Sequence, residues 1–200
     1  MRRPPGDLVA AGVSASIIAG LWVAIKAGWL IRLDTEVLLE AAALIPPAIA
    51  STITRVGDTI VRLAVAAVVA AALLVAGHWR KSLFLILAVA GGAVFNEGLK
   101  LLVGRARPDL LPSVEQIHGT SFPSGHAAGA AVLFGSLALL APFRFRVTAL
   151  IVAVFAAVLV GASRIALGVH WPSDVMAGFS SAVIWIIIAS RCVPMARGTR

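Results

Sequence analysis

The sequence predicts an all-α membrane protein in which six transmembrane helices, joined by short loops, form one domain over residues 1–200. Composition and patterning support this prediction. Of the 200 residues, 60% are hydrophobic and only 13% are charged, whereas a soluble domain is about 45–50% apolar and about 25% charged. The apolar residues occur in long runs, and about 20 such residues suffice to cross a bilayer core roughly 30 Å thick. An apolar content this high also excludes a disordered chain.

The first predicted span covers residues 8–31. This run is too long for the apolar region of a signal peptide, so we interpret it as a retained span. The following segment, 33–58, is apolar in its middle but contains Glu40 and the pair Pro46-Pro47. We interpret this segment as an interfacial helix followed by a turn. If it crossed the membrane, every later span would be inverted.

The other predicted spans follow the apolar runs 59–77, 82–103, 124–141, 147–163 and 172–190. Basic residues near the ends of spans set the orientation, because cytoplasmic loops carry an excess of lysine and arginine. With the N-terminus inside, the cytoplasmic segments hold one acidic residue, Asp7, and nine basic residues: Arg2, Arg3, Arg80, Lys81, Arg144, Arg146, Arg191, Arg197 and Arg200. We therefore predict a multi-pass protein of the inner cell membrane with both termini in the cytoplasm.

Three groups of polar residues are not explained by this orientation. They are Lys100 with Arg107-Pro108, then Pro123 to His126, and finally Ser163-Arg164 with His170 and Asp174. The order of the spans places all three groups on the same, external face. A charged residue in a membrane bundle is costly and is by default a candidate for function. The groups therefore predict one functional site on the extracytoplasmic side.

The basic residues of this site indicate a ligand with several negative charges, most simply a phosphate. The planar guanidinium groups of Arg107 and Arg164 can each bind two phosphate oxygens, while Lys100 acts as a point charge. Ser124 and Gly125 stand at the start of a predicted helix, where free backbone N–H groups favour an anion. Gly125 has no Cβ, so a ligand can approach the backbone closely.

Two histidines complete the predicted site. Asp174 follows His170 by four positions, roughly one helical turn, so its carboxylate can accept a hydrogen bond from the ring. This bond would fix the tautomer of His170 and leave its other nitrogen nucleophilic. His126 would protonate the leaving oxygen as a general acid. Because Cys192 is the single cysteine, a disulfide within the chain and a cysteine-based metal site are excluded.

These groups resemble the three sequence motifs of the type 2 phosphatidic acid phosphatase superfamily. Lys100, six further residues and Arg107-Pro108 are similar to its first motif, and Pro123-Ser124-Gly125-His126 is similar to its second. Ser163-Arg164, five residues, His170, three residues and Asp174 are similar to its third. No motif position departs from the pattern, and the resemblance covers residues 100–174 directly.

The resemblance implies a two-step phosphoryl transfer without a metal or another cofactor. His170 would attack phosphorus and form a phosphohistidine while Asp174 holds its ring. His126 would protonate the leaving group and then activate the water that hydrolyses the intermediate. The implied phosphate ligands are Lys100, Arg107, Ser124, Gly125 and Arg164.

The hypothesis from the sequence is therefore an integral membrane lipid phosphatase. Its substrate would be a polyprenyl pyrophosphate, a phosphatidate or a phosphatidylglycerophosphate that reaches the site laterally from the bilayer. One alternative is a phosphotransferase of the same superfamily, which passes the phosphoryl group to an acceptor hydroxyl. A remote alternative is an anion transporter that uses the cations as a binding site. A nucleic-acid partner is not expected, because the basic residues punctuate apolar runs and do not cluster on a polar surface.

Some charged residues near the motifs allow more than one interpretation. Glu97 lies on the same helical face as Lys100 and would either tune that lysine or only neutralise it. Arg105 would contact lipid headgroups or structure its loop, and His118 would contact the substrate or serve only the loop. Arg62 is interpreted as a side chain that extends from the membrane edge to the headgroups.

Overall fold

The computed structural model describes residues 6–112 and 119–194, and within these ranges all regular structure is helical. The elements are α1 (Gly6–Lys26), α2 (Ile31–Leu44), α3 (Pro47–Thr54), the 3₁₀ helix η1 (Arg55–Gly57), α4 (Thr59–Val75), α5 (Trp79–Val103), α6 (Gly125–Leu140), the 3₁₀ helix η2 (Phe143–Phe145), α7 (Arg146–Ala166) and α8 (Pro172–Cys192). The all-α prediction is thus confirmed for the described residues.

Each predicted apolar run forms a helix, but the helices differ in length. Among the described residues, α1, α5, α8 and the segment Phe143–Ala166 are long and apolar enough to cross a membrane, and a fifth span results if the bent pair of α2 and α3–η1 counts as one. Helices α4 and α6 have 17 and 16 residues, about 24–26 Å at 1.5 Å per residue, against a bilayer core of roughly 30 Å. The count of six spans is therefore not confirmed and stays a prediction.

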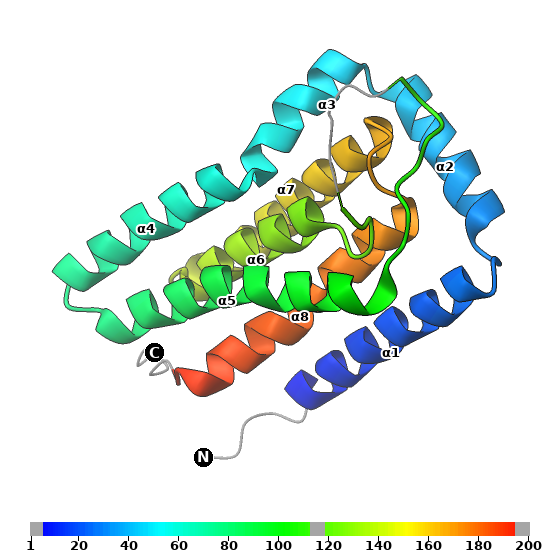
Figure 1. The fold of residues 1–200 in the computed structure, drawn as a ribbon. Coiled ribbons are helices and arrows are strands. Elements are labelled where there is room, and N and C mark those ends of the chain that lie inside the picture. The colour runs from blue at the N-terminus through cyan, green and yellow to red at the C-terminus, as the bar shows by residue number, and fades with distance from the viewer. Residues whose placement is uncertain (1–5, 113–118, 195–200) are drawn as a thin grey trace.

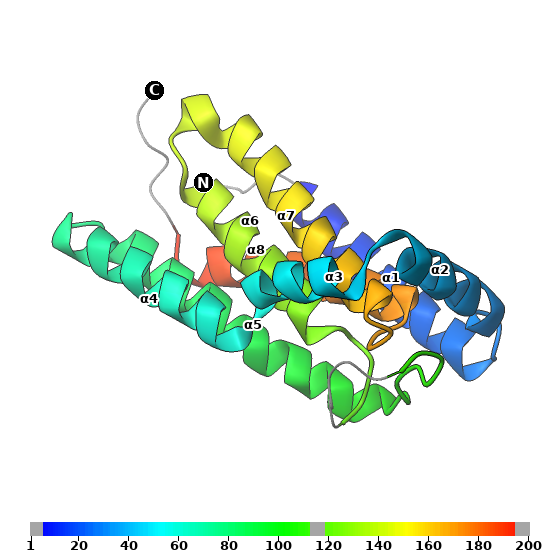
Figure 2. The ribbon, with the colours of Figure 1, turned by 90° about the horizontal axis from the view of Figure 1, so that it is seen from above.

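Residues 33–58 form two helices, where the sequence predicts one helix and a turn. The axes of α2 and of α3 with η1 meet at an angle of 101°. Pro46 and Pro47 explain the break, because proline cannot continue α2 but fits the first turn of α3, where its missing N–H has no helical acceptor. Both helices pack against α7, and Figure 2 shows α3 over the end of α7. The interfacial location of this segment stays a prediction.

Helices α5 to α8 form the centre of the molecule, with α1 packed against α8 (Figure 1). Small residues allow α6 and α8 to lie very close together. A Cβ on Gly178 of α8 would be 2.7 Å from the carbonyl oxygen of Ser124 and 3.2 Å from the backbone nitrogen of Ala128 in α6. Only glycine therefore permits this approach of the two helices.

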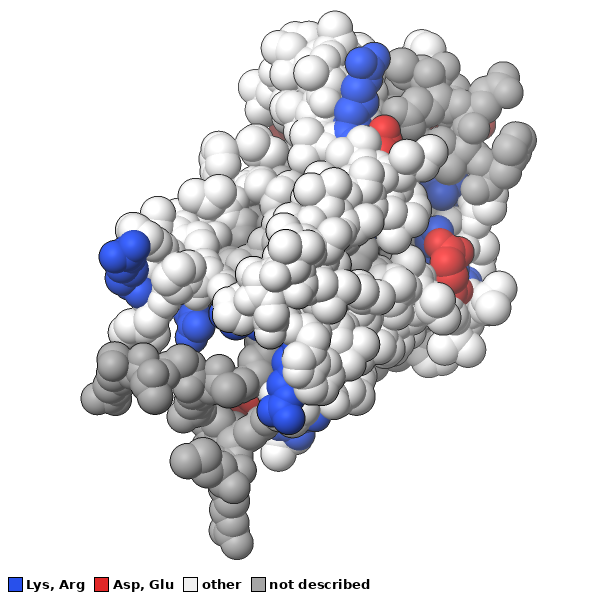
Figure 3. Space-filling model, turned by 90° about the vertical axis from the view of Figure 1, so that its left-hand side faces the viewer, with Lys and Arg blue, Asp and Glu red and all other residues white. Residues whose placement is uncertain are grey.

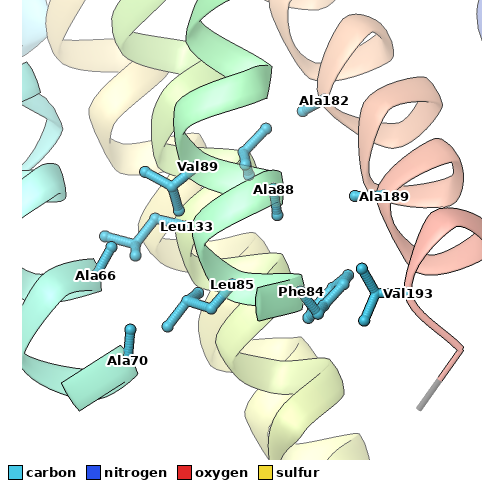
Figure 4. Close-up of a cluster of buried hydrophobic side chains, with 11 residues drawn as sticks. Ala66, Ala70, Phe84, Leu85, Ala88, Val89, Leu133, Ala182, Ala189 and Val193 are labelled. Atoms are coloured by element: carbon cyan, nitrogen blue, oxygen red, sulfur yellow. The ribbon is translucent and has the colours of Figure 1, made fainter. Parts of the chain in front are cut away.

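A cluster of buried apolar side chains joins the helices at one end of the bundle (Figure 4). Phe84 and Leu85 of α5 are fully buried there, beside Leu133 of α6 and alanines of α4 and α8. Because lipid tails are as apolar as these side chains, the cluster stabilises the bundle through van der Waals contacts rather than exclusion of water. Lys100 lies about four turns further along α5, so the predicted site is at the opposite end of this helix.

The outer surface of the helices is also apolar. Val75, Leu101 and Phe143 are 91%, 89% and 85% exposed, and charged side chains are sparse on the face drawn in Figure 3. Extensive exposed apolar surface marks a region that contacts lipid or another apolar partner. The surface therefore agrees with a protein embedded in a membrane.

Candidate active site

The three predicted groups of polar residues meet at one end of the bundle, where α5 and α7 end and α6 and α8 begin (Figure 1). Main-chain hydrogen bonds join the groups. The N–H of Ser124 donates to the carbonyl of Asp174 (3.0 Å), and the N–H of Ser121 donates to the carbonyl of Arg105 (2.8 Å). The first bond connects the second and third motifs, and the second connects the loops of the first and second motifs.

His170 lies in the turn between α7 and α8 and is almost completely buried. Its Nδ1 is 3.6 Å from Oδ2 of Asp174 and 3.4 Å from Oγ of Ser121. The hydroxyl of Ser121 in turn donates to Oδ2 of Asp174. Across the ring, Nε2 is 3.1 Å from Nη1 of Arg107. One ring nitrogen of His170 therefore faces a carboxylate and the other faces a cation.

The surroundings of His170 keep its ring uncharged at neutral pH. Burial lowers the pKa of His170 to about 4; Asp174 opposes this shift, while Arg107 and Arg164 add to it. The acceptors near Nδ1 assign the ring hydrogen to that nitrogen, which leaves a lone pair on Nε2. Nε2 is therefore the nitrogen that can act as a nucleophile.

Arg107 is held by main-chain carbonyl groups of two loops. Its Nη1 donates to Val169 (2.8 Å), its Nε to Gly119 (3.2 Å) and its Nη2 to Thr120 (3.3 Å). Val169 immediately precedes His170, whereas Gly119 and Thr120 lead into the second motif. These bonds fix the guanidinium group beside Nε2 of His170.

Arg164 is completely buried near the end of α7. Its Nη1 donates to Oγ1 of Thr54 (2.8 Å), the last residue of α3. The guanidinium group lies within electrostatic reach of both His126 and His170. Helix α3, which carries none of the three motifs, therefore helps to place the third predicted cation.

Lys100 faces the start of α6. Its Nζ would be 3.7 Å from a Cβ placed on Gly125, and it forms an ion pair with Oε1 of Glu97 (2.6 Å). This ion pair is consistent with both roles considered for Glu97, which are to tune Lys100 or only to neutralise its charge. Ser124 is completely buried, and its Oγ has no hydrogen-bond partner in the described parts of the chain. An ammonium group and a hydroxyl group thus both lie at the N-terminus of α6, and such a set of donors suits a phosphate oxygen.

His126, in the first turn of α6, has a carboxylate partner that sequence reasoning missed. Its Nε2 is 3.0 Å from Oδ1 of Asp58, and both side chains are partly exposed. An aspartate directly before a helix is usually interpreted as a helix cap, but the side chain of Asp58 caps no N–H of α4. Asp58 instead holds the second predicted catalytic histidine.

The interpretation of Arg62 as a side chain that extends to the headgroups is wrong. Arg62 is only 5% exposed, and it donates to the carbonyl of Gly57 (2.8 Å) and to Oγ1 of Thr59 (3.0 Å). Its guanidinium group lies against Gly129, where a Cβ would come within 1.5 Å of Nη1. The missing side chain at position 129 makes room for a buried cation one turn along α6 from His126.

The sequence analysis leaves open whether His118 contacts the substrate or serves only its loop. His118 lies outside the described residues. Among the residues that are described, no three histidine, cysteine, aspartate or glutamate side chains form a group that could hold a metal ion.

The chain is similar in sequence to known phosphatases. The model of the PAP2 superfamily matches residues 81–197. Phosphatidylglycerophosphatase B of Bacillus subtilis is 37% identical over 108 residues, which cover 51% of this chain and 53% of that protein. Lipid A 1-phosphatase of Rhizobium etli is 35% identical over 107 residues, which cover 47% of this chain and 44% of that protein. The chain thus spans about half the length of the curated relatives it matches.

The fold is similar to that of two solved structures, one of which is described as transmembrane. The crystal structure of a transmembrane PAP2-type phosphatidylglycerolphosphate phosphatase from Bacillus subtilis has a TM-score of 0.85 and 26% identity, covering 95% of this chain and 98% of that one. The crystal structure of LpxE from Aquifex aeolicus has a TM-score of 0.64 and 25% identity, covering 80% of this chain and 95% of that one. Because the family model matches more than half of the sequence and the fold agrees over almost all of it, the chain belongs to the PAP2 superfamily.

Proposed function

We propose that this chain is an integral membrane lipid phosphatase that hydrolyses its substrate through a phosphohistidine intermediate, without a metal. The observation that carries the proposal is the geometry around His170, which has Asp174 near Nδ1 and Arg107 beside Nε2; burial also lowers the pKa of His170. Two relatives are named as a phosphatidylglycerophosphatase and a lipid A phosphatase, which supports a phosphate group on a lipid as the substrate.

In the first step, the lone pair on Nε2 of His170 attacks phosphorus. A P–N bond forms while the P–O bond to the leaving group breaks, and the leaving oxygen takes a proton from His126. The hydrogen on Nδ1 remains directed at Asp174, whose negative charge stabilises the positive charge that develops on the ring. The neutral resting state of His170 makes this attack feasible without prior loss of a proton.

In the second step, His126 acts as the base. It takes a proton from a water molecule, the water oxygen attacks phosphorus, and the P–N bond breaks to release inorganic phosphate and neutral His170. In both steps the phosphoryl oxygens are stabilised by the positive charges of Lys100, Arg107 and Arg164. Metal ions supply such charge in other phosphoryl-transfer enzymes, and here three side chains take this role.

The surface beside the site suits a substrate that remains in the bilayer. Leu101 and Leu102 directly follow Lys100 and are 89% and 74% exposed. Acyl or prenyl chains can contact these residues while the phosphate reaches the cations. We therefore propose lateral entry of a phosphatidylglycerophosphate, a phosphatidate or a polyprenyl pyrophosphate.

Phosphate release from short-chain forms of these three lipids tests the proposal, with the purified full chain in detergent micelles. We expect at least one lipid to be hydrolysed and its hydrolysis to persist in excess EDTA. Loss of activity in EDTA with recovery on adding a divalent metal would overturn the metal-free mechanism. If phosphate is released from none of the three lipids, the proposal that the protein is a lipid phosphatase is wrong. Transfer of the phosphoryl group to added glycerol in place of water would identify a phosphotransferase.

We also propose that both termini face the cytoplasm and that the site faces the opposite side of the inner membrane. Arg80 and Lys81, at the start of α5, support this orientation because Lys100 of the site lies near the other end of the same helix. In intact spheroplasts, a membrane-impermeant maleimide should label Cys192, which is exposed at the end of α8, only after permeabilisation.

The matched control for this orientation is a Leu110→Cys variant that also carries Cys192→Ser. Leu110 is 45% exposed in the loop that follows the first motif. A cysteine at this position should react before permeabilisation. The reverse labelling pattern would show that the protein is inserted the other way.

A further inference from the structure

A network of buried charged groups lies behind Asp174, on the side away from His170. Nη1 of Arg105 donates to Oδ1 of Asp174 (2.8 Å) and to Oγ of Ser173 (2.7 Å), while Nη2 donates to Oδ2 of Asp34 (2.6 Å). Asp34 also accepts hydrogen bonds from the backbone N–H (3.0 Å) and the hydroxyl group (2.7 Å) of Ser173. A single guanidinium group thus connects two carboxylates, one of which belongs to the proposed active site.

Neither Arg105 nor Asp34 occupies a defining position of the three motifs, although Arg105 is one of the six unspecified residues between Lys100 and Arg107. Arg105 is two positions before Arg107, and Asp34 is in the first turn of α2, well before the residues that the family model matches. The side chains of Arg105, Asp34 and Asp174 are 10%, 4% and 0% exposed. Charges buried to this extent are costly unless they are paired and hydrogen-bonded. The pairing therefore determines where each of these groups can lie.

The two oxygens of Asp174 have separate partners. Oδ2 accepts the backbone N–H of Trp171 (2.9 Å) and the hydroxyl of Ser121, and it is the oxygen nearest His170. Oδ1 accepts from Arg105. The contact with Arg105 therefore holds the second oxygen of the carboxylate, while Trp171 and Ser121 hold Oδ2 beside Nδ1 of His170.

The position of Arg105 is itself fixed from two directions. The two Nη atoms donate to different carboxylates, those of Asp174 and Asp34. The guanidinium carbon also lies 5.2 Å from the centre of the Trp171 ring, within the range of a cation–π contact. A lysine, which is a point charge on a flexible stem, cannot reproduce both the fork and the stacking.

We propose that Arg105, fixed by Asp34, is a positioning residue of the reaction, because it orients Asp174 and through it the nucleophile His170. Helix α2 thereby becomes part of the catalytic apparatus. This inference rests on the proposed roles of His170 and Asp174. The competing explanation is that the ion pair only fastens α2 to the start of α8 and affects stability alone.

The kinetic constants of purified variants test the proposal, with short-chain phosphatidylglycerophosphate as the probe. Loss of an outer partner of a metal ligand lowers activity by about 10–100-fold, and we expect Arg105→Met to lower kcat by a similar factor. KM should change by less than about twofold, because the phosphate ligands are untouched. Arg105→Lys should recover only part of kcat. The matched control is Glu36→Gln, which breaks the exposed Arg32–Glu36 ion pair on α2, the helix that carries Asp34. This variant should leave kcat and KM unchanged.

A double variant separates positioning from fastening. Arg105→Met alone removes the cation that pairs with both buried carboxylates, Asp34 and Asp174, which destabilises the protein. Asp34→Asn combined with Arg105→Gln removes both charges and should return the melting temperature toward that of the unmodified protein. If Arg105 positions Asp174, kcat remains low in the double variant. If kcat recovers together with the melting temperature, the ion pair only fastens α2 and the proposal is wrong.

His170→Asn distinguishes failure of this inference from failure of the proposed function. If His170→Asn hydrolyses the lipid at the rate of the unmodified protein, the proposed mechanism and the inference that rests on it both fall. If His170→Asn is inactive while Arg105→Met is as active as Glu36→Gln, the proposed mechanism stands and only the proposed positioning role of Arg105 is wrong.

Discussion

Replacing His170 by asparagine should remove essentially all phosphate release, with a loss in kcat of at least about 10⁴-fold. Nε2 of His170 is the proposed nucleophile, and an asparagine amide has no comparable lone pair. The residue is buried between Asp174, Ser121 and Arg107, and asparagine is small and polar enough to remain there. Inorganic phosphate released from the lipid panel by the purified variant measures the effect.

His78→Asn is the matched control for this substitution. His78 is exposed, directly precedes α5 and makes no side-chain capping bond, so its replacement should leave the rate unchanged. Rapid quenching of the unmodified protein with a ³²P-labelled lipid should also show a protein-bound label that is lost in acid and retained in alkali. A His170→Asn variant that keeps the label, or more than about one hundredth of the rate, would contradict the assignment of the nucleophile.

Asp174→Asn should lower kcat by about 10⁴-fold, as expected when an orienting carboxylate next to a catalytic histidine loses its charge. The amide keeps the size of the side chain but no longer stabilises positive charge on the ring of His170. KM should stay nearly constant, because the proposed phosphate ligands Lys100, Arg107 and Arg164 are unchanged. Steady-state kinetics on the hydrolysed lipid check both constants.

The melting temperature must accompany this measurement, because Asp174 also accepts hydrogen bonds from Arg105, Ser121 and the backbone of Trp171. Asp109→Asn, in the exposed loop after the first motif, is the control and should match the unmodified protein in rate and melting temperature. An Asp174→Asn variant that melts normally and loses less than about tenfold in kcat would show that the carboxylate does not take part in the reaction.

The predictable part of the molecule is the part governed by local patterns. Long apolar runs predict the positions of the helices, and Gly104, with a φ of 62°, ends α5 where the apolar run ends. The order of the predicted spans brings Lys100, Arg164 and His170 to one end, and the structure shows them there. Both results depend on spacing along the chain, which a single sequence contains.

The partners of the motif residues were not predictable in the same way. Asp34, Thr54 and Asp58 all lie in or beside α2 and α3, yet they contact residues at least 68 positions away. Each is a small polar residue near a helix end, where capping or an interaction with the helix dipole is the ordinary interpretation. Their true contacts depend on the bend of 101° between α2 and α3, and the size of such an angle cannot be read from a proline pair.

The close packing of α6 and α8 at Gly178 has a consequence for the evolution of this site. His126 belongs to one of these helices, and His170 lies two positions before the other. The separation of the proposed acid from the proposed nucleophile therefore depends on the absence of a Cβ at Gly178, beside the carbonyl of Ser124. Any side chain at position 178 would force α6 and α8 apart, although position 178 carries no proposed catalytic group. A substitution at position 178 would therefore change the spacing of His126 and His170 without changing any of the proposed catalytic groups.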